Sequence, residues 1–129
     1  MYSICIEYIK AQNIYRLVPE DYSDNKLFPL AQLFDEVVWS NWTQDFEQFL
    51  FDDTAATYGS NESHVQKKED KLLIYPFSGK HFAVSKRAFY SLFTELKQAF
   101  AVKTTLLTVS WDGQKFMVEK HTGMEKIHE

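Results

Sequence analysis

The residues best suited to acid–base or metal chemistry are four histidines: His64, His81, His121 and His128. None of them stands in an HExxH pattern or in the Cys/His spacing of a zinc site. His81 falls beside a predicted hairpin turn, which favours a surface position over a role as general base. The sequence therefore predicts no metal site and no catalytic histidine.

Cys5 is the single cysteine of the chain, and it lies in the apolar run Ile4-Cys5-Ile6. That setting is typical of a small buried hydrophobic side chain. A nucleophilic thiol would need a base beside it, and no Cys/His pairing can be read from the sequence. One cysteine also excludes an intrachain disulfide and suits a reducing compartment.

Adjacent carboxylates are the second class of acid–base candidates. Asp35-Glu36 and Asp52-Asp53 are neighbours in the chain, and neighbours on a helix point in different directions, so each pair is poorly placed for shared acid–base work. A pair from distant segments, as in glycosidases, stays open, because the sequence does not show distances in space. The four glycines are isolated and form no phosphate-binding loop. We therefore expect no catalytic residues and no cofactor.

Charge is divided unevenly along the chain. Residues 1–66 carry three basic and eleven acidic residues, a formal charge of −8, whereas residues 67–129 carry eleven basic and seven acidic residues, a formal charge of +4. An acidic surface attracts a basic partner and accelerates encounter with it. An ordinary solvated acidic face is the alternative that stays open.

The segment 39–53, WSNWTQDFEQFLFDD, combines aromatic and acidic residues. Phe46, Phe49 and Leu50 are assigned to the core by their helical spacing. Aromatic anchors surrounded by charge are typical of a protein-binding hot spot, although both tryptophans could equally belong to the core. The predicted partner interface consists of Trp39, Trp42, Asp45, Glu47, Asp52 and Asp53.

Neither nucleic acid nor a membrane is an expected partner. The doublets Lys67-Lys68 and Lys86-Arg87 could touch phosphate, but they lack the clustered basic and aromatic pattern of nucleic-acid modules. No stretch approaches the roughly 18 apolar residues of a membrane span. The first residues show no basic region of a secretory signal. We expect a cytoplasmic protein.

The elements predicted around these residues follow the order β-β-α-α-β-β-α-β-β. Alternation predicts strands, and apolar residues at three- and four-residue intervals predict helices. The expected strands cover residues 2–8, 14–18, 72–77, 80–84, 104–111 and 114–120, and the expected helices cover 30–38, a segment from Thr43 onward, and 86–101 with Ser85 as N-cap. Residues 52–70 are expected to form a mobile loop and residues 122–129 a frayed tail.

Two hairpins are predicted from their turn residues. Around Ser78-Gly79, a two-residue turn would place Tyr75 opposite Phe82 and Leu73 opposite Val84. Around Asp112-Gly113, a type I′ turn would give one apolar face to both strands. The apolar face of this second hairpin would consist of Leu107, Val109, Trp111, Phe116 and Val118.

These elements predict an α+β fold. In a chain of 129 residues with 45% hydrophobic and 16% aromatic residues, we expect one domain with one core. A mainly antiparallel sheet of about four to six strands, with about three helices on one side, is the simplest assembly.

A small, acidic α+β domain without catalytic motifs resembles the immunity proteins of bacterial toxin systems, such as those of contact-dependent growth inhibition. The resemblance concerns size, charge and architecture, and it rests on no motif. It implies an inhibitor that binds a basic nuclease toxin and covers its active site or a nearby surface. A phage-type inhibitor of a nucleic-acid-processing enzyme, a small enzyme with an unrecognised carboxylate site and a purely structural role stay open.

Overall fold

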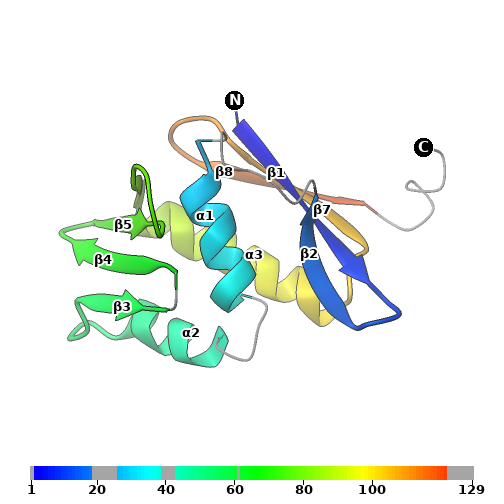
Figure 1. Cartoon of the computed structure of the whole chain (residues 1–129), viewed down its shortest axis with the longest axis horizontal. Helices are drawn as coiled ribbons and strands as arrows, with labels where there is room; N and C mark the ends of the chain where they lie inside the picture. The colour runs from blue at the N-terminus through cyan, green and yellow to red at the C-terminus, as the bar shows by residue number, and fades with distance from the viewer. Residues whose placement is uncertain (1, 19–25, 39–42, 61, 122–129) are drawn as a thin grey trace.

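The protein is an α+β domain in which helices lie between two antiparallel sheets (Figure 1). The computed structural model describes residues 2–18, 26–38, 43–60 and 62–121. Helix α3 (Lys86–Ala101) contacts strands of both sheets, and helix α1 (Phe28–Leu33) contacts the second. The predicted α+β class is confirmed, and the predicted order of elements broadly matches, although the structure has two further strands between α2 and β5. The strands, however, form two sheets instead of one: β1, β2, β7 and β8 pair with one another, and β3 to β6 form a separate sheet.

The first sheet joins the two ends of the chain. Its strand order is β2-β1-β7-β8, with β1 at Tyr2–Ile9, β2 at Ile14–Val18, β7 at Leu106–Trp111 and β8 at Phe116–His121. Ile4 and Ile6 of β1 lie opposite Val109 and Leu107 of β7, and all four are buried. The predicted alternation of the first strand therefore reflects one face packed on the core.

The second sheet is built from the middle of the chain, in the order β3-β4-β5-β6. Its strands are β3 (Thr57–Gly59), β4 (His64–Lys68), β5 (Lys71–Tyr75) and β6 (Phe82–Ser85). The expectation of a loop over residues 52–70 was therefore wrong, since this segment contains β3 and β4. Val65 explains the difference: it is fully buried and pins β4 against the core despite its polar neighbours.

The hairpin β5–β6 is shifted by one residue from the predicted register. Ile74, not Tyr75, lies opposite Phe82. Pro76 has no N–H to donate and ends the strand, so the connection runs from Pro76 to His81 instead of two residues. Because side chains alternate between faces, this shift places Ile74 in the core.

The hairpin β7–β8 also has a longer turn than predicted. Trp111 lies opposite Phe116, and a four-residue loop, 112–115, connects the strands. The Asp112 carboxylate accepts the backbone N–H groups of Gln114 and Lys115 at 2.8 and 2.9 Å, which closes this loop. The register moves by two residues, so the predicted apolar face is preserved.

The helices agree closely with their sequence signals. Pro29 lies in the first turn of α1, where its missing N–H costs nothing, and π-helix η1 (Phe34–Val38) continues α1. Helix α2 covers Thr43–Phe51. The predicted N-cap of α3 is confirmed, since Ser85 Oγ accepts the N–H of Ala88 at 3.1 Å.

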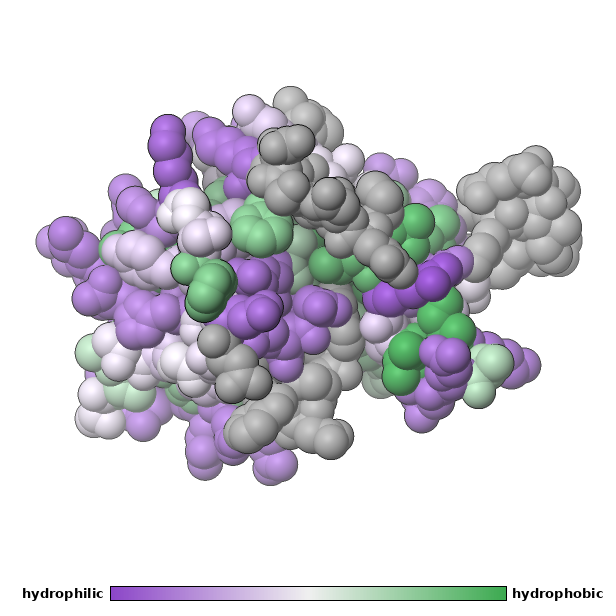
Figure 2. All heavy atoms as spheres, viewed as in Figure 1, coloured by the Kyte–Doolittle hydropathy of each residue, from purple (hydrophilic) through white to green (hydrophobic). Residues whose placement is uncertain are grey.

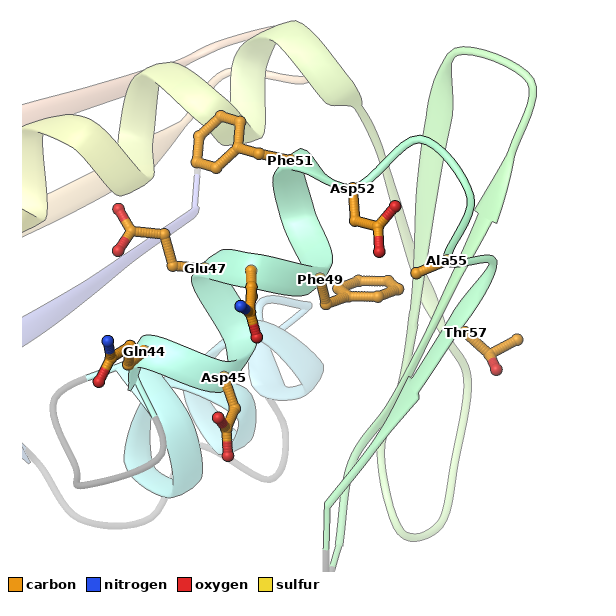
Figure 3. Close-up of a pocket in the computed structure, with 9 residues that line it drawn as sticks. Gln44, Asp45, Glu47, Phe49, Phe51, Asp52, Ala55 and Thr57 are labelled. Atoms are coloured by element: carbon orange, nitrogen blue, oxygen red, sulfur yellow. The ribbon is translucent and has the colours of Figure 1, made fainter.

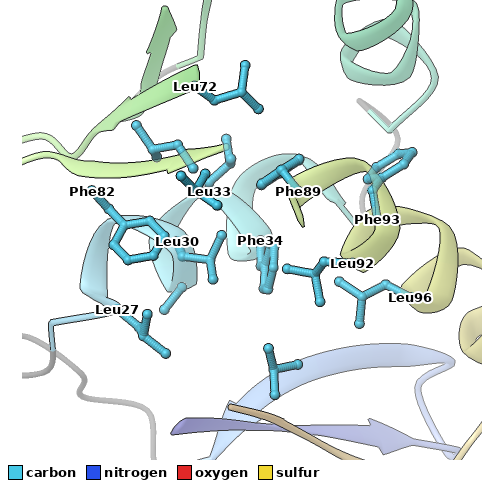
Figure 4. Packing of buried hydrophobic residues seen from close by; sticks show 14 of the residues in the cluster. Leu27, Leu30, Leu33, Phe34, Leu72, Phe82, Phe89, Leu92, Phe93 and Leu96 are labelled. Carbon is cyan, nitrogen blue, oxygen red and sulfur yellow. The ribbon is translucent and has the colours of Figure 1, made fainter. Parts of the chain in front are cut away.

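One hydrophobic core connects both sheets and the helices (Figure 4). Phe34 of η1 and Phe89 and Phe93 of α3 are each about 1% exposed or less. Leu72 and Phe82 bring the second sheet to the same cluster. A single continuous core is what a domain of this size needs for stability. Among the described helices, none is long and apolar enough to cross a bilayer.

Candidate functional site

Helix α2 presents a polar face with one acid, Asp45, opposite its buried stripe. Phe46, Phe49 and Leu50 are buried, as their spacing predicted. Gln44, Asp45 and Gln48 are exposed on the remaining surface. Asp45 lies in the first turn, where a negative charge also complements the partial positive charge of the helix N-terminus. The sequence pattern thus fixes which side of α2 can meet a partner.

A shallow groove runs along α2 toward β3 and has a volume of about 730 Å³. Figure 3 shows Phe49 and Ala55 on facing elements, with the Asp52 carboxylate beside the Phe49 ring. Three of the predicted interface residues, Asp45, Glu47 and Asp52, line this groove. The remaining lining residues are Gln44, Gln48, Phe49, Phe51, Ala55 and Thr57.

The C-terminal end of α2 is held by two side chains from other elements. Lys67 Nζ of β4 donates to the carbonyl oxygens of Phe49 and Asp52 at 2.6 and 2.7 Å, and it lies 4.5 Å from the centre of the Phe49 ring. Tyr90 Oη of α3 donates to the Leu50 carbonyl at 2.7 Å. A cation complements the partial negative charge of a helix C-terminus. This tether fixes the position of the groove.

The local environment keeps Asp52 ionised. Its carboxylate accepts the hydroxyl and the N–H of Thr54 at 2.7 and 2.9 Å, and these hydrogen bonds lower the pKa of Asp52 below its ordinary value. Asp53 is exposed next to it. Burial, with a smaller contribution from the Asp53 charge, raises the pKa of Tyr90. At neutral pH this end of the groove therefore carries negative charge.

Glu47 differs from the other predicted interface acids. Its carboxylate pairs with Lys97 Nζ of α3 at 2.5 Å and is only about one-third exposed. It therefore ties α2 to α3 and offers less charge to a partner than Asp45 or Asp53. The predicted anchors Trp39 and Trp42 lie outside the described residues.

Phe51 is the aromatic residue of this site that sequence reasoning overlooked. Its side chain is 56% exposed, and its ring lies 5.0 Å from that of Tyr90. The helical spacing could have predicted this exposure. Phe46, Phe49 and Leu50 share the buried stripe, whereas Phe51 lies about 100° further around the helix axis than Leu50. The groove thus has an exposed apolar edge beside its acids.

Other exposed apolar side chains are dispersed. Figure 2 shows mainly hydrophilic side chains over the described part of one face, with a small apolar area at the β1–β2 hairpin. Ile14 of that hairpin is 46% exposed, and Phe77, in the β5–β6 connection, is 77% exposed. The described residues on this face form no wide apolar area of the kind that marks a large obligate interface.

Two of the acid–base candidates, Glu36 and Cys5, contact side chains or backbone of other elements. Glu36 of η1 accepts the Ser60 hydroxyl at 2.8 Å and the Glu62 N–H at 2.9 Å, which ties the helix to the β3–β4 connection. Cys5 Sγ lies 3.7 Å from Thr108 Oγ1 and is half-buried. Within the described part of the chain, no cluster of three or more histidine, cysteine or acidic residues could hold a metal ion.

Comparison with protein-family models, with curated proteins and with solved structures found no match to this chain.

Proposed function

We propose that this chain is a protein-binding inhibitor whose α2 groove receives a basic partner. The proposed biological setting is immunity in the cytoplasm of a bacterium, with a nuclease toxin as the partner. The observation that carries the proposal is the combination of a groove, acidic side chains and the exposed aromatic ring of Phe51 along α2 and directly after it.

The charges of the groove favour a cationic partner. In the described residues, Asp45 and Asp53 take part in no ion pair, so their charges are available at the surface. Lys67 is the nearest base on β4, and helix carbonyl groups already occupy its ammonium. A partner with a positively charged surface would replace water around these acids, and the electrostatic attraction would accelerate its association.

Occlusion is the proposed mechanism of inhibition. A nuclease binds its substrate through lysine and arginine contacts to phosphate. Acidic side chains that pair with those residues compete directly with nucleic acid. Phe51 would add an apolar anchor within the charged contact, because desolvated aromatic groups supply much of the energy of small interfaces.

The first experiment is co-purification of the tagged full chain with the products of neighbouring genes. Washes at low salt and at about 0.5 M salt separate electrostatic from apolar binding, because exposed charge pairs are largely screened at the higher salt. We expect a basic protein that co-purifies in a stoichiometric amount and stays bound during the low-salt wash. Recovery of no partner in either wash contradicts the proposal.

Charge reversal then tests the groove itself. We expect Asp45→Lys with Asp53→Lys to weaken binding to the recovered partner by about tenfold or more, mainly through slower association. Glu119→Lys, a single charge reversal at an exposed acid on β8 away from the groove, is the control and should bind within about twofold of the original chain. Equal loss in both variants, or loss in neither, would move the interface away from α2.

A further inference from the structure

A second cavity lies between the first half of α3 and the β7–β8 hairpin, with a volume of about 320 Å³. Pockets for small molecules usually have about 300–1,000 Å³. This cavity therefore has the size of one small organic molecule. It lies outside the α2 groove, and the two share no lining residue.

The floor of the cavity is apolar and firmly supported. Ala88 and Leu92 of α3 face Phe116 and Val118 of β8. The Phe116 ring packs 4.5 Å from the ring of Trp111, measured between centroids, which fixes one wall. An apolar floor of this kind favours a ligand with an aromatic or branched aliphatic body.

Two cations stand at the rim. Arg87 and Lys115 line the cavity from facing elements, and both are exposed. In the described chain neither side chain takes part in a hydrogen bond or ion pair. Asp112 accepts the N–H of Lys115 and thereby fixes the loop that carries this lysine. The rim can therefore receive an anion without breaking existing contacts.

One carboxylate sets the limit on ligand charge. Glu95 also lines the cavity, two helical turns beyond Arg87 and about 12 Å along the axis. Among the lining residues, the side chains of Arg87, Lys115 and Glu95 together carry one net positive charge, and the Asp112 carboxylate in the same loop as Lys115 offsets part of it. A single anionic group near Arg87 and Lys115 is matched, whereas a longer dianion would meet Glu95.

We propose that this cavity binds a small organic monoanion, with its carboxylate at Arg87 and Lys115 and its apolar body over Leu92 and Phe116. The backbone N–H of Ala88 at the start of α3 is already bonded to Ser85 Oγ, so the side chains of the rim provide the recognition. Charge complementarity, the apolar floor and the cavity volume together define this class.

The test is an NMR titration of the full chain with 3-phenylpropionate. Acetate supplies the charge without the ring, and 3-phenylpropionamide supplies the ring without the charge. We expect saturable shifts from 3-phenylpropionate at the amides of residues 87–92 and 114–118, and binding weaker by about fivefold or more for the other two compounds. Absence of saturable shifts, or equal affinity for the amide, overturns the proposal.

Three variants locate the binding charge. Arg87→Gln and Lys115→Gln should each weaken 3-phenylpropionate binding by about fivefold, and Glu95→Gln should strengthen it by about twofold because a like charge is removed. Lys80→Gln, which removes an exposed cation in the β5–β6 connection, should leave affinity unchanged. An unchanged affinity in both rim variants, with thermal unfolding intact, would exclude this site.

Discussion

A lysine side chain from another element stabilises the C-terminal end of α2. Lys67 donates to two carbonyl groups at that end although it belongs to β4. Burial and the neighbouring Lys86 charge lower its pKa, so the site holds this cation at some cost in solvation. At the residue scale, the groove therefore depends on a side chain outside the acidic segment.

Tyr15 offers a pH test at the same scale. Its hydroxyl donates to the Phe100 carbonyl at 3.3 Å, and burial, with a smaller effect of Tyr8, raises its pKa to about 12. Because the unfolded chain loses this proton near pH 10, stability should fall as pH rises from about 10 to about 12.

The variant Tyr15→Phe should lose part of this alkaline sensitivity. Urea unfolding at pH 8, 10 and 12 measures how the free energy of unfolding changes with pH. Burial also raises the pKa of Tyr58 and Tyr90, so some sensitivity should remain. If the free energy of unfolding of the variant changed with pH as much as that of the original chain, the role given to Tyr15 would be contradicted.

At the scale of elements, the cap of α3 carries a measurable share of stability. Ser85→Ala removes the acceptor for the Ala88 N–H and should lower the free energy of unfolding by about 1 kcal/mol. Ser85→Asp restores an acceptor and should recover most of the loss. Urea denaturation measures both variants, and equal stability of the alanine and aspartate variants would exclude the cap as the cause.

Local signals predicted the elements better than their pairing. Ser85 marked the start of α3, because an N-cap acts on its own neighbours, whereas α1 begins two residues before the expected start at residue 30. The strand around Val65 was missed, since a single buried residue among polar ones gives no alternation to detect. The turn at Ser78-Gly79 was misplaced because burial of Ile74 decided the register.

The candidate site was predictable only in part, because some of its contacts join segments that are distant in the chain. Charge and spacing identified Asp45 and Asp52, which lie on or directly after α2. The contribution of Lys67 depends on β4 lying beside α2, and the pairing of Glu47 depends on the approach of α3. Such contacts arise from the packing of distant segments, which local patterns do not encode.

At the scale of the whole molecule, Phe46 links three elements. Its ring contacts those of Tyr58 in β3 and of Phe89 and Phe93 in α3, at centroid distances of 5.3, 6.0 and 5.9 Å. Phe46→Ala should cost about 3–5 kcal/mol, a large share of the roughly 5–15 kcal/mol that stabilises a typical domain.

We expect this loss to affect the entire domain cooperatively. Thermal unfolding followed by far-UV and near-UV circular dichroism should give coincident, lowered midpoints. Phe46→Leu, which keeps most of the side-chain volume, should lower the midpoints less than Phe46→Ala does. Separate transitions for the two signals would show that α2 and the second sheet unfold independently of the rest.

The pairing of β1 with β7 has a consequence for synthesis of the protein. Tyr2 lies opposite Trp111, so β1 leaves the ribosome long before its central neighbour β7 has been synthesised. Meanwhile β3 to β6, within residues 57–85, can pair as they emerge. A two-stranded ribbon such as β1–β2 is marginal alone, so the nascent chain carries Ile4 and Ile6 without their β7 neighbours until β7 has been synthesised.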